Sequence, residues 1–308
     1  MSFVYKSDAE RGAIWARAFS ERLPEIDFRI WPDVGDPSAV QYLAAWEPPE
    51  NLAETFPNLK VVFSVGAGVD QFDFSRIPAE VSVVRMIESG LVAGMVEYAT
   101  LAVLAIHRDW LTYAAQQQDS EWKPLRVRSA ASRRVGVLGM GVLGQAVLEK
   151  LQGFGFPCAG WSRTARELPG VDSYAGEAGL DAFLARTDIL VCLLPLTDNT
   201  RGVLCRSLFE RLPPGAALIN VGRGGHLVEQ DLLDALAQGR LSAAILDVFD
   251  NEPLPAEHPF WHHPRIVVTP HIASMTQAET SAEVVLDNVR RHREGQPLNG
   301  LVDRRRGY

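Results

Sequence analysis

The sequence is poor in cysteine and carries no excess of basic charge. Its 308 residues include only three cysteines, Cys158, Cys192 and Cys205, which form neither a disulfide framework nor the paired spacing of a zinc site. We therefore expect a reducing compartment. The 38 acidic residues outnumber the 30 basic ones, and the formal net charge of −8 gives no electrostatic basis for a nucleic acid partner.

Long apolar segments are also scarce. The longest, from Leu91 to Ile106, is shorter than the roughly 20 residues that a membrane-spanning helix needs, and it contains Glu97. It predicts a buried helix. The N-terminus has no apolar core of signal-peptide length, so we expect a cytoplasmic protein with no membrane partner. The basic run at 304–306 is interpreted as a solvated tail.

Short apolar runs alternate with helical patterns along most of the chain, which is typical of α/β architecture with parallel sheets. Four predicted strands lie in the first third, near Val4 and at 42–46, 59–66 and 81–86. After a long helical pattern at about 94–117, a second series lies at 134–141, 156–161, 188–196, 217–222, 243–249 and 265–271. A last helical pattern covers about 276–293. Two domains are predicted: a discontinuous one, residues 1–98 and 275–308, and a second, residues 99–274.

A glycine motif follows the first strand of the second series. Gly139, Gly141 and Gly144 have the spacing G-x-G-x-x-G, directly after the strand-like run VGVL and before a helical pattern. In this context the first glycine permits a tight turn, the second lets the backbone approach a pyrophosphate, and the third lets the helix pack on the strand. We expect the helix N-terminus, with Val142 and Leu143, to face the phosphates of a dinucleotide. A glycine turn that binds nothing and a site for SAM or FAD are the alternatives.

The next strand ends without the acid that often binds the ribose hydroxyls of NAD. Hydroxyl and cationic side chains stand there instead: Ser162, Arg163, Thr164 and Arg166. A guanidinium can form bidentate, charge-assisted bonds to a phosphate dianion, and hydroxyl groups can donate to it. These residues predict NADP(H) as the preferred cofactor, with NAD(H) as the second choice. The alternative is that Arg163 and Arg166 are solvated loop residues.

Three polar residues follow three further strands. Arg223 lies in NVGRGG, Glu252 in LDVFDNEPLP and His271 in TPHIAS. Each comes at or just after the C-terminal end of a predicted parallel strand, the edge at which open α/β sheets bind ligands. Each residue taken alone would more often be structural, but the set indicates a catalytic site.

With these motifs the sequence resembles the D-2-hydroxyacid dehydrogenase family over nearly its whole length. The motifs that carry the resemblance are SVGAGVDQF (64–72), GMGVLG (139–144), LLPLT (193–197), NVGRGG (220–225), LDVFDNEPLP (246–255) and TPHIAS (269–274). The stretches WEPP and GFPCAGWSRTAR and the ending VDRRRGY make it most similar to the short glyoxylate/hydroxypyruvate reductase A branch. The resemblance implies two Rossmann-like doubly wound domains, a flavodoxin-like substrate domain and a dinucleotide-binding domain, and a homodimer. It also implies NADPH-dependent reduction of small 2-oxo acids, glyoxylate to glycolate and hydroxypyruvate to D-glycerate.

Residue roles follow from the resemblance and from the chemistry of reduction. Hydride addition to a ketone leaves an alkoxide, so His271 would donate a proton, Glu252 would orient the imidazole, and Arg223 would hold the 2-oxo acid. Backbone amides of the substrate loop would cradle the substrate carboxylate. The substrate-binding residues implied are Trp46, Val65, Gly66, Ala67 and Arg223, although Trp46 can equally be an ordinary core residue. The cofactor-binding residues implied are Gly139, Gly141, Val142, Leu143, Gly144, Ser162, Arg163, Thr164, Arg166, Leu194, Pro195, Val221, Gly222, Arg223, Asp247 and His271.

Other interpretations remain open at this point. An NAD-preferring dehydrogenase of another 2-hydroxy acid is one, and a nucleotide-sensing, corepressor-like binding protein is another. No metal site is expected, because no cysteine or suitable acid joins the cluster of His258, His262 and His263. Gly222 stands where relatives often have alanine, a change expected to be harmless.

Overall fold

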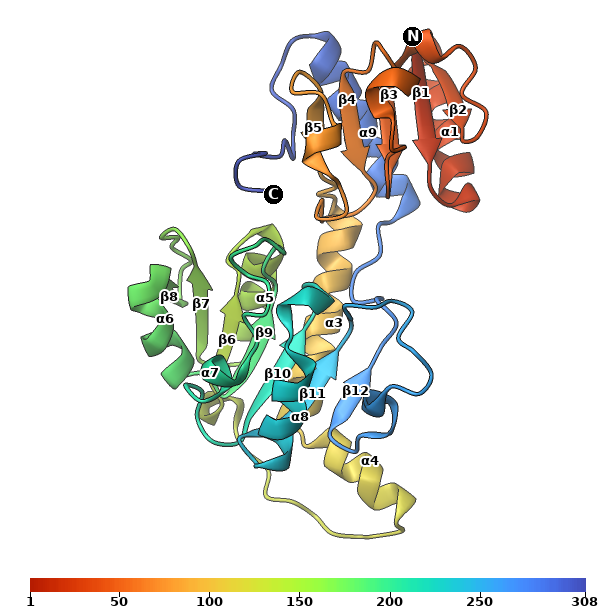
Figure 1. Ribbon diagram of the computed structural model, residues 1–308. Helices are drawn as coiled ribbons and strands as arrows, with labels where there is room; N and C mark the ends of the chain where they lie inside the picture. Colours follow the sequence, from red (N-terminus) through yellow and green to blue (C-terminus); the bar gives the residue numbers. More distant parts are fainter. The chain divides into compact units, whose positions relative to one another are not determined.

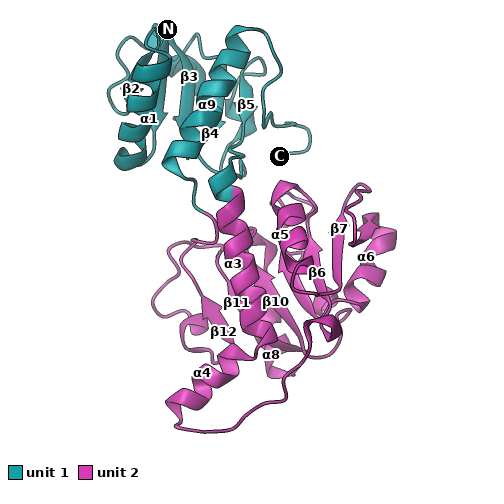
Figure 2. Ribbon diagram, turned by 180° about the vertical axis from the view of Figure 1, so that it is seen from behind, with its two compact units in different colours: residues 1–91, 275–308 teal, residues 92–274 magenta.

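The computed structural model describes the whole chain, Met1 to Tyr308, and separates it into two units (Figure 2). Unit 1 contains residues 1–91 and 275–308, and unit 2 contains residues 92–274. The chain leaves unit 1 inside helix α3 (Ser89–His107) and returns to it shortly before helix α9 (Ala278–Arg293).

Unit 1 is built on a five-stranded parallel sheet. Its strands are β1 (Ser2–Lys6), β2 (Asp27–Ile30), β3 (Val40–Ala45), β4 (Val61–Ser64) and β5 (Ser82–Val84). Their order, β2-β1-β3-β4-β5, is that of flavodoxin-like sheets. Helices α1 (Ala9–Arg22) and α9 pack against each other on one face, and α2 (Leu52–Thr55) lies on the other. Because both faces of the sheet are covered, side chains of β1 are buried on either side of it. Phe3 and Tyr5 face α1 and α9, and Val4 faces the opposite side.

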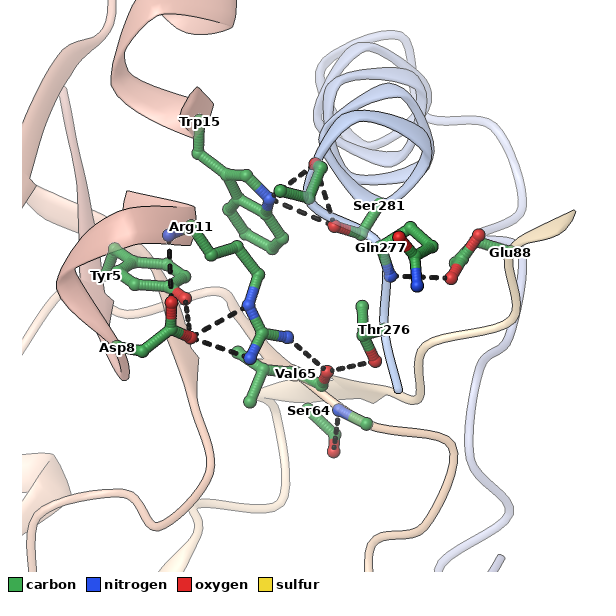
Figure 3. A network of polar contacts seen from close by, with 12 residues as sticks. Tyr5, Asp8, Arg11, Trp15, Ser64, Val65, Glu88, Thr276, Gln277 and Ser281 are labelled. Atoms are coloured by element: carbon green, nitrogen blue, oxygen red, sulfur yellow. Dashed lines mark hydrogen bonds and ion pairs between the residues drawn. The ribbon is translucent and has the colours of Figure 1, made fainter. Parts of the chain in front are cut away.

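One buried carboxylate ties together the two segments through which the chain enters and leaves unit 1 (Figure 3). Glu88, only 3% exposed, accepts hydrogen bonds from the amides of Gly90 and Leu91 at the start of α3. It also accepts from the amide of Gln277 (3.1 Å) and the hydroxyl of Thr280 at the start of α9. Two helix N-termini therefore share one negative charge, which is the favourable sign for their dipoles.

Unit 2 is built on a seven-stranded parallel sheet (Figure 1). Its strands are β6 (Val135–Leu138), β7 (Cys158–Ser162), β8 (Asp172–Ala175), β9 (Ile189–Cys192), β10 (Ala216–Asn220), β11 (Leu241–Leu246) and β12 (Ile266–Val268). Helices α3 and α5 (Val142–Gln152) cover one face, and α6 (Gly176–Ala185), α7 (Arg206–Phe209) and α8 (Glu229–Ala237) cover the other. The order β12-β11-β10-β9-β6-β7-β8 reverses direction between β6 and β9, the switch point at which doubly wound sheets bind ligands. The predicted parallel α/β architecture is confirmed.

The long helical pattern at 94–117 is two helices rather than one. Asp109 adopts a left-handed backbone (φ 54°), which ends α3 and turns the chain into α4 (Trp110–Gln118). One face of α3 is buried in the core of unit 2, through residues such as Met95 and Val103, whereas Leu101 is 67% exposed. By length and composition alone α3 is the one helix that could cross a membrane, a test that the core helix of a soluble protein also passes.

Candidate active site

The glycine motif forms the turn between β6 and α5. Gly139 has φ 109°, and a side chain there would lie 2.7 Å from the carbonyl oxygen of Leu193. A Cβ on Gly144 would lie 1.9 Å from the carbonyl oxygen of Gly139, so the helix can approach the strand only with glycine at this position. A Cβ on Gly141 would meet nothing within 4 Å. The middle glycine thus leaves open space at the N-terminus of the eleven-residue helix α5, where a phosphate finds backbone N–H groups and a favourable dipole.

The residues expected at the 2′-phosphate lie at the end of β7, the strand beside β6. The amide of Gly139 donates to the carbonyl of Trp161 (2.8 Å), which joins the end of β7 directly to the glycine turn. Ser162 is buried, and its hydroxyl donates to the carbonyl of Thr164 (2.8 Å). The side chains of Arg163, Thr164 and Arg166 are exposed. The guanidinium groups of Arg163 and Arg166 are therefore exposed after the end of β7. The hydroxyl proton of Ser162 is engaged in a hydrogen bond within the turn.

Glu252 and His271 are brought into direct contact. Nδ1 of His271 lies 2.8 Å from Oε2 of Glu252, and Oε1 of the same carboxylate accepts from the amide of Phe249 (2.9 Å). A carboxylate only accepts, so Nδ1 carries the proton in this bond and Nε2 is the ring atom left to face a ligand. The two side chains are each 34% exposed, so the pair is fixed in place and still open to solvent.

The backbone of His271 is held in an unusual conformation. Its φ of 53° lies in the left-handed region, which a residue other than glycine keeps only when its surroundings enforce it. The surroundings here are Asp247, whose carbonyl accepts from the amide of His271 (2.9 Å) and whose carboxylate accepts from the amides of Ile272 (2.9 Å) and Ala273 (2.8 Å). Thr269 adds a hydroxyl donor to the carboxylate (2.6 Å).

Asp247 was expected to bind the cofactor, but its side chain is used internally. It is 1% exposed, and both carboxylate oxygens accept hydrogen bonds from the protein. Burial raises the pKa of this carboxyl, and the donors around it act in the opposite direction. Tyr98 of α3 extends the network, because its hydroxyl contacts the Thr269 hydroxyl. This network supports the backbone of His271 from behind.

Arg223 lies at the carboxyl end of β10, which pairs with β11. It is half-buried, and its Nη1 donates to the carbonyl of Gly222 (2.8 Å). The turn that carries it packs directly on the segment before Glu252, since a Cβ on Gly224 would lie 1.8 Å from the carbonyl carbon of Phe249. The turns that carry Arg223 and Glu252 are therefore neighbours at one edge of the sheet.

The remaining expected cofactor residues lie around the same edge. Leu194 and Val221 are nearly buried, at 8% and 5% exposure, and Val221 continues β10 by donating to the carbonyl of Cys192 (3.2 Å). The carbonyl of Pro195 accepts from the hydroxyl of Thr200 (2.7 Å). Val142 and Leu143 begin α5, with Val142 49% exposed. Gly222 is buried.

The expected substrate loop follows β4 in unit 1. The carbonyl of Val65 accepts from Nη1 of Arg11 (3.1 Å) and from the hydroxyl of Thr276 (2.8 Å), and Arg11 is held in turn by an ion pair with Asp8 (Figure 3). These two donors fix the peptide plane after Val65. They also satisfy its carbonyl oxygen, which as a hydrogen-bond acceptor would otherwise repel an anion.

Two of the three expected anion-binding amides are engaged within unit 1. The amide of Val65 donates to the carbonyl of Ala45 (3.2 Å), and that of Gly66 donates to the hydroxyl of Ser64 (3.2 Å). The amide of Ala67 has no acceptor in the protein and is therefore the one that remains open to a ligand. Trp46 is 41% exposed, which excludes a core position, and a Cβ on Gly66 would lie 3.0 Å from its ring.

No group of three or more His, Cys, Asp or Glu side chains in the chain is arranged to hold a metal ion. His258 instead pairs with Glu229, Nε2 to Oε2 at 3.1 Å. Three residues that support the site, Tyr98, Thr269 and His226, are not among the site residues expected from the sequence. Tyr98 acts through Thr269, far away in the sequence, and Thr269 and His226 stand beside the expected residues in TPHIAS and NVGRGG without a catalytic pattern of their own.

Comparison with known proteins gives the same family as the sequence motifs. Residues 100–273 match the family model of the D-isomer specific 2-hydroxyacid dehydrogenase NAD binding domain. The glyoxylate/hydroxypyruvate reductase A of Yersinia enterocolitica is 42% identical over 300 residues, 96% of each chain. Among solved structures, a D-isomer specific 2-hydroxyacid dehydrogenase from Xanthobacter autotrophicus in complex with NADPH and MES has a TM-score of 0.94 and 39% identity over 99% of each chain. An NADPH-dependent glyoxylate/hydroxypyruvate reductase from Sinorhizobium meliloti, with NADP and sulfate, has a TM-score of 0.92 and 38% identity, covering 100% of this chain and 99% of that one. The resemblance is thus confirmed: the chain belongs to the D-isomer specific 2-hydroxyacid dehydrogenase family and is an NAD(P)-dependent oxidoreductase.

Proposed function

We propose that this enzyme reduces small 2-oxo acids with NADPH, glyoxylate to glycolate and hydroxypyruvate to D-glycerate. The names of its relatives in Yersinia enterocolitica and Sinorhizobium meliloti support this substrate class. The observation that carries the proposal is the 2.8 Å contact between His271 and Glu252 at the carboxyl edge of the sheet in unit 2. A domain that only binds a nucleotide does not need a histidine and a carboxylate in hydrogen-bond contact at this edge of the sheet.

The pair is suited to deliver a proton. When bound, the reduced cofactor supplies the hydride, and negative charge develops on the carbonyl oxygen of the substrate. Nε2 of His271 donates the proton that converts this oxygen to a hydroxyl group. Glu252 accepts the proton of Nδ1 and thereby holds the ring with Nε2 available to the substrate.

Arg223 is the proposed anchor of the 2-oxo acid. Its planar guanidinium can hold carboxylate and carbonyl oxygens together, and it stabilises the charge that develops on the carbonyl. The open amide of Ala67 is a second proposed donor to the substrate carboxylate. Trp46, which rests on Gly66, is proposed to shield that loop from water.

The cofactor is proposed to bind unit 2, with its pyrophosphate at Gly141 and the N-terminus of α5. Arg163 and Arg166 are proposed to bind the 2′-phosphate, with Thr164 as a further donor. Residues 99–274 are accordingly proposed as the nucleotide-binding domain, and residues 1–98 with 275–308 as the substrate domain.

A homodimer in the cytoplasm is proposed as the working form. The surface of α3, α4 and the extended segment that follows carries large apolar side chains: Leu101 (67% exposed), Trp110 (67%), Trp122 (98%) and Val127 (72%). Large apolar side chains that are exposed on neighbouring segments of a chain are often covered by a partner subunit.

Steady-state assays of glyoxylate and hydroxypyruvate, each with NADPH and NADH, test the proposal. We expect turnover on the order of 10 per second with NADPH, and a loss of about 100- to 10,000-fold in kcat for His271→Ala. Turnover thousands of times lower than this in the wild-type enzyme would favour a nucleotide-sensing protein instead. A wild-type kcat in His271→Ala would show that another group delivers the proton.

A further inference from the structure

A second histidine of unit 2 is buried beside Arg223 and has no part in the proposed reaction. His226 ends the short turn Gly224–His226 after β10 and is 0% exposed. A buried imidazole must satisfy both of its nitrogen atoms within the protein. Both have close polar neighbours here, and the neighbours come from two different loops.

The neighbours define which ring nitrogen carries the proton. Nε2 lies 3.2 Å from the carbonyl oxygen of Pro195, which can only accept, so Nε2 is protonated. Nδ1 lies 3.1 Å from both the amide nitrogen and the carbonyl oxygen of Arg223. The carbonyl already accepts from the backbone amide of His226 (3.2 Å) and from Nδ2 of Asn220 (3.1 Å), which fill its two lone pairs, so Nδ1 is assigned as the acceptor for the Arg223 amide and is unprotonated. One neutral imidazole satisfies both contacts. It links the loop after β9, which contains Pro195, to the turn after β10, which contains Arg223.

These contacts hold the backbone of Arg223 from both sides. Its amide donates to Nδ1 of His226, and its carbonyl accepts from Nδ2 of Asn220 (3.1 Å). The guanidinium is held over the same turn by the bond from Nη1 to the carbonyl of Gly222 (2.8 Å). The position from which the Arg223 side chain extends is therefore set by the imidazole, by the side-chain amide of Asn220 and by the backbone amide of His226, which donates to the same carbonyl (3.2 Å).

Gly222 lies against the imidazole ring of His226. A Cβ at this position would lie 3.1 Å from Cε1 and Nδ1 of His226 and 3.1 Å from the carbonyl oxygen of Leu194. These distances are tighter than ordinary van der Waals contacts, so alanine would displace the imidazole or the loop after β9 by a few tenths of an ångström. The glycine at position 222, where relatives often have alanine, was expected to be harmless. Its lack of a side chain leaves the space that the imidazole of His226 occupies.

We propose that His226 is a positioning residue for Arg223, and that it acts by fixing the Arg223 backbone relative to the loop that contains Pro195. The proposal rests on the proposed role of Arg223 as the substrate anchor. It predicts that disturbing His226 weakens binding of the oxo acid and leaves binding of the nucleotide nearly unchanged.

Two substitutions separate the two hydrogen bonds. His226→Asn places an amide oxygen near the position of Nδ1, so it can still accept from Arg223 but cannot reach Pro195. His226→Gln places an amide nitrogen near the position of Nε2, so it can still donate to Pro195 but leaves the Arg223 amide without an acceptor. An unsatisfied buried donor is costly, and we expect KM for glyoxylate to rise about 10-fold in His226→Gln and only about 2-fold in His226→Asn. We expect the Kd of NADPH, measured by fluorescence titration, to stay within about 2-fold of wild type in both.

A matched control removes a histidine of the same unit that does not contact Arg223. His258→Gln can still reach Glu229 from the position of Nε2 but leaves the amide of Phe260 without the Nδ1 acceptor, so it matches His226→Gln, and we expect it to leave KM for glyoxylate unchanged. Gly222→Ala should raise KM for glyoxylate on its own. Adding His226→Asn to Gly222→Ala should raise it by less than the product of the two single effects, because the smaller side chain makes room for the methyl group.

Calorimetric titration of the NADPH-loaded enzyme with oxalate gives a readout that does not depend on turnover. We expect oxalate to bind about 10-fold more weakly to His226→Gln than to the wild type. The inference is overturned if both His226 variants bind glyoxylate and oxalate as the wild type does. It is equally overturned if they lose affinity for oxalate and NADPH by the same factor, the result expected of a general loss of structure. A wild type that binds oxalate and does not reduce glyoxylate refutes the proposed function alone, and one that does neither refutes both.

Discussion

The carboxylate of Glu252 contacts the imidazole of His271 through Nδ1, and the same carboxylate accepts the amide of Phe249. Glu252 therefore sets the orientation of the imidazole ring. It also requires that Nδ1, the nitrogen that faces the protein, carries a proton. The opposite nitrogen, Nε2, is the one available to a ligand.

Replacing Glu252 with glutamine should separate orientation from charge. The amide can still occupy the site but lacks the carboxylate charge beside the proton donor, so we expect kcat for glyoxylate reduction to fall about 100-fold. The ring stays in place, so KM for glyoxylate should change by less than about 3-fold. Steady-state kcat and KM for the two enzymes measure both effects. A Glu252→Gln enzyme with the kcat of the wild type would show that the charge of Glu252 does not contribute to proton transfer.

Arg163→Glu should change the preference between cofactors. A carboxylate at this position repels a 2′-phosphate, so we expect kcat/KM with NADPH to fall about 10- to 100-fold while the value with NADH changes by less than about 3-fold. Arg17→Glu is the control, since it makes the same change in net charge on an exposed part of α1. An equal loss with both cofactors would disconnect Arg163 from the 2′-phosphate.

Asp247→Asn should impair the reaction although the residue is buried behind the site. Asparagine has one acceptor oxygen, so it cannot replace both carboxylate oxygens towards Thr269, Ile272 and Ala273. The His271 backbone, at φ 53°, should then relax, and a small misplacement of the proton donor can cost about 100-fold in kcat. Tyr98→Phe removes only the outermost hydroxyl of the network, so a smaller loss is expected. An Asp247→Asn enzyme with full kcat would show that the network does not hold His271.

The glycine motif could be predicted from sequence because its chemistry is local. Gly144 packs on the carbonyl of Gly139 five positions earlier, and Gly139 needs the positive φ of the turn itself, so the spacing together with the flanking strand and helix patterns predicts the turn. The parallel strands were also predictable where they are buried on both faces. The strands β2 and β8 were missed, because they lie at the edges of their sheets and have mainly exposed or half-buried side chains with no continuous apolar run.

Long-range contacts set the limit of that prediction. Tyr98 meets Thr269 across 171 positions of sequence, and no spacing reveals the pair. Arg304 was interpreted as part of a solvated tail and is instead anchored, since its guanidinium donates to the carbonyls of Ile77, Pro78 and Val81. A run of arginines in a sequence indicates positive charge only. The backbone carbonyls that accept from Arg304 belong to residues of any type, so the sequence does not reveal them.

Leu101→Glu should yield a monomer if the apolar surface of α3 and α4 is the dimer interface. A buried, unpaired carboxylate in an interface is strongly unfavourable, so the mass measured by light scattering should fall to that of one chain. Val228→Glu is the control, because Val228 is an exposed apolar residue next to α8, which covers the opposite face of the sheet. A dimer that survives Leu101→Glu would place the interface elsewhere.

The three cysteines should differ sharply in reactivity, because only Cys205 is partly exposed. Burial raises the pKa of the Cys158 thiol to about 11 and that of the Cys192 thiol to about 12, so neither forms a thiolate until the solution is strongly alkaline. The thiolate is the reactive form, and we expect one thiol per folded chain to react with Ellman's reagent at pH 8, and all three after unfolding in guanidinium. Cys205→Ser should abolish the reaction of the folded protein and leave the other two thiols to appear on unfolding. Rapid reaction of a second thiol at pH 8 would mean that β7 or β9 opens to solvent far more readily than a core strand of this sheet should.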